Sequence, residues 1–351
     1  MISRLYRLLP VLPVLFLVLL CPVRSYSALS FNLDSIADKG RFARFCVNVY
    51  RWGDVVFNGV DTCYVRPVGY KWNVKLRSSS WSEFDNFYFS RGHEMMMTTP
   101  FCSSIGGDVQ FMAVSLGYDI NINKLFGGQD RSKSKFNFEF SSGLFFARFY
   151  SIVNADGMDI IRYGDTKDVS LPYKSVHTTV WGLDATYVFN PRRYSNSAAF
   201  SFGKIQVRSQ GSWLAGLAFQ SQKLDFDFSG LPAEVGEWLP DRWRGGRYSA
   251  DGFSIGFSGG YGFNWVPRRN WSVGVQGLLA PSLYYGYLNG MRKEYGFKMN
   301  YRINLGAVWN HKRWFAGVTA KFDSSFIYSG STLTDGLLNI EAKVGWRFNL
   351  F

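Results

Sequence analysis

The chain has 351 residues, of which 47% are hydrophobic and 18% aromatic, and its formal net charge is +13. The mean hydropathy is only −0.08, because the apolar residues are numerous but are not gathered into long runs. After the first 27 residues no apolar stretch approaches the ~20 residues of a spanning helix, which excludes a helical membrane protein. Such a chain could cross a membrane only as a closed β-barrel, which satisfies every backbone polar group in lipid.

Residues 1–27 have the features of a secretory signal peptide. Arg4 and Arg7 give a positive start, residues 8–20 form a short apolar segment, and small residues precede a cleavage point before Ala28. Removal of the three basic residues of this segment lowers the net charge from +13 to +10 (13 − 3), which still favours contact with anionic surfaces. Because the chain is predicted to be secreted, nucleic acid is not expected as a partner.

Residues 28–60 are predicted to form a separate N-terminal periplasmic helical segment. Apolar residues recur there at spacings of three and four, and basic residues lie between them. The recurring apolar residues are Leu33, Ile36, Phe42, Phe45, Val49 and Trp52. The segment is interpreted as a cap packed under the following domain or, alternatively, as an interfacial membrane helix.

Three cysteines follow the signal peptide, at Cys46, Cys63 and Cys102. Their odd number leaves at least one thiol unpaired, and a Cys63–Cys102 disulfide is one possibility. No CxxC pair occurs and the three histidines lie far apart, so the sequence predicts no metal site and no cofactor.

Residues 61–351 are predicted to form one all-β domain. In the clearest stretch, 253–265, aromatic and aliphatic residues alternate with Gly, Ser and Asn. Successive side chains of a strand point to opposite faces, so one face is largely apolar and the other is small and polar. The same alternation returns at 271–279, 299–309, 314–322 and 338–350.

These strands favour a transmembrane barrel over a soluble sandwich. They match or exceed the 9–11 residues that cross a bilayer. The chain also has 32 Phe, 20 Tyr and 12 Trp, more than a soluble core usually needs. Trp265 and Trp271 bracket one tight turn, and Trp309 and Trp314 bracket the next, as in an interfacial aromatic girdle. We therefore predict an antiparallel up-and-down transmembrane β-barrel.

Loop lengths predict the orientation and the number of strands. The short turns at 267–270 and 310–313 are expected on the periplasmic side, and the basic run 131–135 is assigned to another periplasmic turn. The longer connections, expected on the extracellular side, lie at 152–175, 227–250, 287–297 and 329–337. Further strands are expected near 70–90, 104–120, 135–151, 177–189 and 212–226. The total is about ten strands, with eight or twelve as alternatives.

A motif in the middle of the chain resembles a known family. It runs from Tyr187 to Ser195 as YVFNPRRYS and continues with Ala198-Ala199-Phe200 and Gly211-Ser212. These residues resemble an uncharacterised family of Bacteroidetes proteins, catalogued as a domain of unknown function and held to form outer-membrane barrels. The resemblance covers roughly 55–351. It implies a barrel in the outer membrane of a Gram-negative bacterium, and it carries over no activity or site residues.

The polar face of the later strands predicts a lumen lined by charged side chains. These are Arg302, Lys321, Asp323, Glu341, Lys343 and Arg347. A barrel of about eight to ten strands leaves an interior that side chains nearly fill, so opposite charges are expected to pair there. The main hypothesis is a structural or interaction barrel with a side-chain-filled lumen, and the alternative is a narrow transport channel for small polar solutes.

A membrane-embedded hydrolase or acyl transferase is the second alternative. Such an enzyme needs a nucleophile beside an oriented base, and the candidate bases are His93, His177 and His311. No GxSxG motif accompanies them, so no catalytic residue is assigned.

Outer-membrane lipids and the barrel-assembly machinery are the expected partners. That machinery reads a terminal Phe in the lipid-facing register, but Phe351 falls in the opposite register, so either the last residue bends outward or Phe348 serves as the signal. The connection at 190–211 is either a loop tucked into the periplasmic mouth, which buries Phe200 and Phe202, or a docking site for a periplasmic partner. The basic residues of that docking site would be Arg192, Arg193, Lys204 and Arg208.

Overall fold

The computed structural model describes most of the chain after residue 58. The described residues are 38, 40–45, 47–48, 59–70, 72–111, 114–122, 133–155, 157–288, 293–328 and 332–349. The predicted signal peptide, Cys46 and Phe351 lie outside them. The chain falls into two units, residues 53–350 and a smaller unit of residues 1–52 with residue 351. Within the described residues, no helix is both long and apolar enough to cross a membrane.

In the smaller unit, residues 41–45 and 47–48 are helical. The Arg44 amide donates to the Gly40 carbonyl at 3.0 Å, as in the first turn of a helix. Phe42 and Phe45 are exposed, whereas Val47 is buried. The periplasmic role of segment 28–60 stays a prediction.

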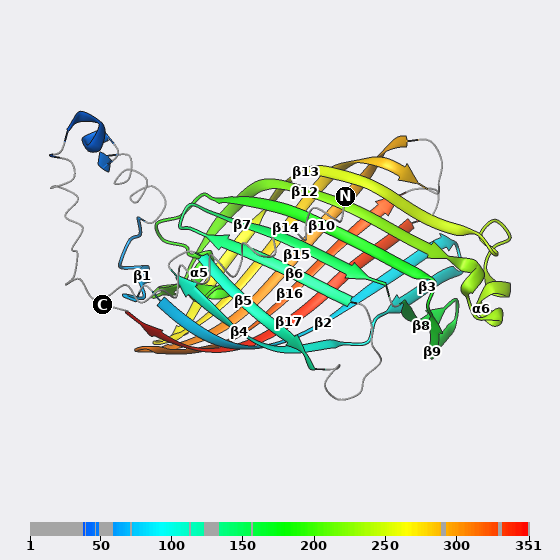
Figure 1. Ribbon diagram of the computed structural model, residues 1–351, viewed down its shortest axis with the longest axis horizontal. Coiled ribbons are helices and arrows are strands. Elements are labelled where there is room, and N and C mark those ends of the chain that lie inside the picture. The colour runs from blue at the N-terminus through cyan, green and yellow to red at the C-terminus, as the bar shows by residue number, and fades with distance from the viewer. Residues whose placement is uncertain are drawn as a thin grey trace. The chain divides into compact units, whose positions relative to one another are not determined.

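The larger unit is an antiparallel β-barrel (Figure 1). Of the fifteen strands that the described residues form in its sheet, three (β3, β8 and β9) extend beyond the ring, which leaves twelve in the ring itself. The ring closes because the last strand pairs with the first, from Thr332 opposite Tyr88 to Phe348 opposite Trp72. The ring strands are β2 (Trp72–Ser90), β4 (Cys102–Phe111), β5 (Val114–Asn121), β6 (Lys133–Ser141), β7 (Phe145–Asn154), β10 (Val176–Val188), β12 (Gln210–Asp227), β13 (Arg247–Arg268), β14 (Trp271–Leu288), β15 (Lys293–His311), β16 (Trp314–Tyr328) and β17 (Thr332–Phe348).

The predicted antiparallel up-and-down order is confirmed, and the ring has twelve strands, the larger of the two predicted alternatives, instead of about ten. The two additional strands arise because 104–120 and 135–151, each predicted as one strand, are hairpins. In the second hairpin, the Ser142 hydroxyl donates to the Phe145 carbonyl at 2.8 Å and accepts from the Phe145 amide at 3.0 Å. Apolar residues continue through the first turn, and in the second Ser142 and Gly143 interrupt the apolar pattern only briefly, so the alternation alone does not reveal the two turns.

The two ends of the barrel differ in their connections. The turn end carries the predicted short turns at 267–270 and 310–313, helix α5 (Asn196–Phe200), and the small sheet of β1 (Val65–Pro67) and β11 (Lys204–Gln206). The loop end carries the longer connections. Their regular elements are β3 (His93–Thr98), β8 (Met158–Tyr163), β9 (Thr166–Tyr173), η2 (Phe228–Gly230) and α6 (Ala233–Trp238). Figure 1 shows α5 and α6 at opposite ends of the barrel.

The assignment of the basic run 131–135 to the periplasmic turns is wrong. Lys133 begins β6 and lies opposite Asn154, the last residue of β7, so it belongs to the loop end. Lys135 points into the barrel lumen. The error follows from the missed hairpin, because each missed strand reverses the side of every connection before it.

Candidate functional site: a lumen closed in three layers

A cluster of paired charges crosses the middle of the lumen. The Arg148 guanidinium donates to Asp323 at 2.8 Å and to Asp184 at 3.1 Å. Arg302 donates to the same two carboxylates, at 2.6 Å each. Arg148 lies on β7 and Asp323 on β16, which are six strands apart in both directions around the ring. These ion pairs therefore connect opposite walls of the barrel.

Two further ion pairs complete this charged layer, one between Lys321 and Glu139 and one between Lys343 and Glu341 at 2.6 Å. These ion pairs join four cations and four anions, each largely buried. The members are Arg148, Arg302, Lys321, Lys343, Glu139, Asp184, Asp323 and Glu341. A buried charge is costly unless it is paired, so the pairing of these eight side chains makes a filled lumen possible.

The structure brings five of the six predicted lumen residues into the charged layer, while Arg347 lies apart from it. Arg347 is fully buried nearer the turn end, where it donates to the Phe202 carbonyl and to Asn310 at 2.8 Å each. Its guanidinium also lies 4.3 Å from the centre of the Phe315 ring.

Sequence reasoning missed three members of the layer: Glu139, Arg148 and Asp184. Glu139 and Arg148 are on the two strands of the unrecognised hairpin. Asp184 does follow the alternation of its strand, in which the small or polar residues Thr178, Gly182 and Thr186 also point inward. That alternation was the available signal.

A plug fills the turn end of the lumen. It consists of α5 with the following Phe202, and it packs against inward glycines of the wall. A Cβ atom on Gly306 would lie 2.5 Å from the Ala199 carbonyl oxygen, and one on Gly274 would lie 2.3 Å from the Ala199 Cβ. Only a residue without a side chain leaves room for this close approach.

Polar contacts fix the plug in place. The Asn264 side chain, fully buried, donates to the Ser195 carbonyl at 2.8 Å and to Gln206 at 3.0 Å. The Ser195 hydroxyl accepts from the Ala198 amide at 3.3 Å and so caps α5. The connection 190–211 is therefore tucked into the mouth, as the burial of Phe200 and Phe202 predicted.

The basic residues of this connection lie mostly on its surface. Arg192, Arg193 and Arg208 are exposed, and Lys204 is half-buried. The guanidinium groups of Arg193 and Arg208 lie 5.0 and 5.7 Å from the centre of the Tyr64 ring.

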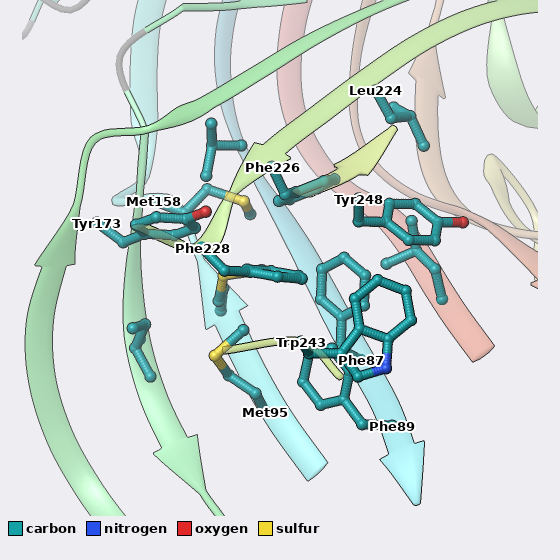
Figure 2. Packing of buried hydrophobic residues seen from close by; sticks show 14 of the residues in the cluster. Phe87, Phe89, Met95, Met158, Tyr173, Leu224, Phe226, Phe228, Trp243 and Tyr248 are labelled. Carbon is teal, nitrogen blue, oxygen red and sulfur yellow. The ribbon is translucent and has the colours of Figure 1, made fainter. Parts of the chain in front are cut away.

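An apolar cluster, the loop-end cap, closes the opposite mouth. The Phe87 ring lies 4.9 Å from the Phe226 ring and 5.1 Å from the Tyr248 ring. Phe87 is on β2 and Phe226 on β12, which are opposite strands of the ring, so the cap spans the mouth. Figure 2 shows these rings packed with Phe228 and Trp243. The cap also includes Phe89, Met95, Met97, Met158, Ile160, Tyr173, Leu224 and Val235.

Two cavities remain between the three layers. One of about 120 Å³ is lined both by Leu224 of the cap and by Arg148 and Arg302 of the charged layer. The other, of about 40 Å³, is lined by the same two arginines and by Phe200 of the plug. The larger cavity has room for several water molecules. The charged layer thus lies between the two cavities.

One candidate base contacts a hydroxyl group. The Ser90 hydroxyl lies 3.1 Å from His93 Nδ1, and the His93 ring lies 5.2 Å from the Trp238 ring. Ser90 and His93 flank the tight turn between β2 and β3. The neighbouring Glu94 pairs with Arg162 at 3.2 Å. The contact is best explained as a side-chain bond that stabilises the turn.

The other two histidines are exposed. His177 is the second residue of β10, and His311 lies at the turn end with its ring 5.8 Å from the Trp309 ring. Cys63 is an exposed free cysteine, so the Cys63–Cys102 disulfide considered from the sequence does not form. Among the described residues, no group of His, Cys, Asp and Glu is arranged to hold a metal ion.

The four predicted girdle tryptophans lie on the outward face, beside the turns. Trp265, Trp271 and Trp314 are 53%, 45% and 54% exposed, and Trp309 is half-buried. Trp271 lies directly opposite Trp309, which places the two side by side on neighbouring strands.

One comparison with known proteins identifies a family, and none identifies an activity. A family model described as "Domain of unknown function (DUF4421)" matches residues 59–348. No curated protein matches the chain.

The chain resembles several solved structures. One is the outer membrane protease OmpT from Escherichia coli, at 7% identity and a TM-score of 0.35, with an alignment that covers 79% of this chain and 96% of the protease. Another is an outer membrane channel from Pseudomonas putida F1, at 9% identity and a TM-score of 0.33, covering 79% and 96%. A third is the Pseudomonas putida toluene transporter TodX, at 9% identity and a TM-score of 0.26, covering 84% and 92%. None of these similarities assigns a function to this chain.

Proposed function

The chain belongs to the DUF4421 family, a domain of unknown function, and we propose that it is a sealed outer-membrane β-barrel with a structural or interaction role. The observation that carries this proposal is the charged layer, in which Arg148 and Asp323 bridge opposite walls of the barrel. A narrow solute channel would need a water path through this layer.

The outward face supports a position in a membrane. On β13 the outward side chains from Phe253 to Trp265 are nearly all large and apolar, and Phe257 is 76% exposed. These two residues are twelve positions apart (265 − 253), or about 40 Å along a strand at ~3.4 Å per residue. A strand tilt of about 35–45° reduces this to about 30 Å along the membrane normal, the thickness of the hydrocarbon core.

The outer membrane is the location we propose. A signal peptide at residues 1–27 would export the chain, and the tryptophans beside short turns would lie at the periplasmic interface. The turn end then faces the periplasm. Outer-membrane lipids surround the wall, and the assembly machinery reads Phe348, whose ring lies 5.1 Å from that of the outward Trp346.

Breaking the charged layer should be costly, which supports a structural role. Removal of Lys321, for example, leaves the largely buried Glu139 carboxylate without its ion pair, and breaking a buried pair in this way costs about 3–5 kcal/mol. The plug and the loop-end cap close the two mouths independently of this layer. A solute would have to displace all three layers to pass.

Conductance across a planar lipid bilayer tests the proposal. The full chain should show no conductance above the lipid leak. The double variant Arg148→Gln with Asp323→Asn should also show no conductance, because the plug and the loop-end cap remain. A variant that combines these two substitutions with Phe87→Ala and deletion of residues 196–202 should conduct ions. Heat-dependent migration on a gel checks that each variant has folded, and stepwise conductance by the unmodified protein would overturn the proposal.

A further inference from the structure

Two neighbouring turns at the turn end each carry two consecutive basic residues. Arg268 and Arg269 lie on the turn between β13 and β14, and Lys312 and Arg313 lie on the turn between β15 and β16. All four are exposed.

Backbone contacts hold these turns together. The Asn310 amide donates to the Asn270 carbonyl at 2.8 Å, which joins the two turns, and the Arg347 amide donates to the Arg313 carbonyl at 2.9 Å. Asn270 and Lys312 have φ values of 75° and 52°, typical of tight hairpin turns. The positions of the four cations are therefore fixed by the wall of the barrel.

These cations have no acidic partner nearby. Among the described residues, none of the four makes an ion pair, and the only further contact is of Arg313 with the Tyr70 ring, at 5.9 Å. The described turn-end residues 59–70, 189–210, 266–272, 309–315 and 346–349 contain ten Lys and Arg but one acid, Asp61, a net charge of +9 (10 − 1). Asp61 pairs with Arg193 at 3.4 Å and with none of these four cations.

Apolar rings adjoin the same cations. Trp271 directly follows the first turn and lies opposite Trp309, which directly precedes the second. A ligand that contacts both features must join an anionic group to an apolar part. Tryptophan prefers the headgroup level of a bilayer, and arginine binds phosphate oxygens through two parallel hydrogen bonds.

We propose that these two turns form a binding site for the headgroup phosphate of an anionic phospholipid in the leaflet facing the turn end. The inference rests on the proposed membrane location, and it adds a lipid class and the residues that select it. Arg268, Arg269, Lys312 and Arg313 bind the headgroup, while Trp271 and Trp309 contact the start of the acyl chains.

The test uses the folded full chain in micelles of a zwitterionic detergent, titrated with dioleoylphosphatidylglycerol or with dioleoylphosphatidylcholine. Native mass spectrometry reads the bound lipid. Replacing all four cations with Gln should weaken phosphatidylglycerol binding by at least about tenfold, because each cation near an anionic surface contributes about fivefold. Phosphatidylcholine binding should not change.

A matched pair of double variants controls for charge. Arg268→Gln with Arg269→Gln should weaken phosphatidylglycerol binding several-fold. Arg66→Gln with Arg192→Gln removes the same charge from exposed turn-end positions outside these hairpins and should change it less than twofold. The inference would be overturned if the two double variants lost phosphatidylglycerol affinity equally. It would also be overturned if a folded variant with all four cations replaced by Gln bound phosphatidylglycerol as well as the unmodified protein. The proposed function is tested separately by conductance. Neither folding in zwitterionic lipid nor the absence of conductance depends on these four cations.

Discussion

The two ends of this barrel are closed by different chemistry. At the turn end a short capped helix fits against glycines and is held by the buried Asn264. At the loop end aromatic rings from opposite strands, such as Phe87 and Phe226, meet across the mouth. The first closure depends on exact fit and hydrogen bonds, and the second depends on buried apolar area.

The charges of the two ends also differ. The turn-end ranges carry a net charge of +9, whereas the described loop-end residues 90–101, 121–122, 133, 157–175, 225–251 and 293–294 have nine Lys and Arg against eleven Asp and Glu, a net charge of −2 (9 − 11). One wall of regular alternating strands therefore supports two unlike ends, because the connections, and not the wall, determine the chemistry of each mouth.

The largest expected effect comes from opening the loop-end cap. Phe87→Ala should lower the free energy of unfolding by about 3–5 kcal/mol, the usual cost of removing a buried Phe side chain. Tyr88→Ala, on the outward side of the same strand and 41% exposed, is the control and should cost much less. Urea unfolding followed by gel migration measures both. A loss at Phe87 below about 1 kcal/mol would contradict an apolar seal.

A smaller effect is expected at the plug. Gly306→Ala should destabilise the protein by about 1–3 kcal/mol, because the added methyl group meets the Ala199 carbonyl in a packed site. Gly277→Ala is the matched control, since no atom lies within 4 Å of its Cβ position. If both alanines have the same effect on unfolding, the plug does not depend on close fit.

The smallest effect is expected for an exposed ion pair at the loop end. Arg162→Ala removes the ion pair with Glu94, in which the Arg162 side chain is 35% exposed and the Glu94 side chain 43%. This substitution should lower the free energy of unfolding by less than about 1 kcal/mol. Arg302→Ala, in the charged layer, is the comparison and should cost several times more. Equal unfolding midpoints in urea for these two variants would show that the buried pairs are not structurally important.

The sequence predicts the wall of the barrel well and its interior in part. Alternation along 253–265 predicts the strand and its outward face, because a strand's period of two depends only on local geometry. The hairpin at 142–144 escapes detection because Ser142 and Gly143 interrupt an apolar pattern too briefly.

The partners inside the lumen cannot be predicted in the same way. Arg302 and Asp323 are near in sequence, but Arg148 reaches them from a strand on the opposite wall. That meeting depends on the number and stagger of all the strands between. The loop-end cap is a similar case, since nothing local to Phe87 shows that Phe226 will cover it.

The pairing of β17 with β2 has a consequence for how the protein is made. Thr332 must find Tyr88, and Phe348 must find Trp72, so closure joins the two most distant strands of the domain. Contacts of such long sequence separation form slowly, because the entropy of ordering the intervening chain is lost before the contacts stabilise it. Until the C-terminal strand arrives, β2 and β16 each present an unpaired edge, which invites association with other chains. The whole chain must therefore be present, and must be kept from aggregating, before the barrel can close.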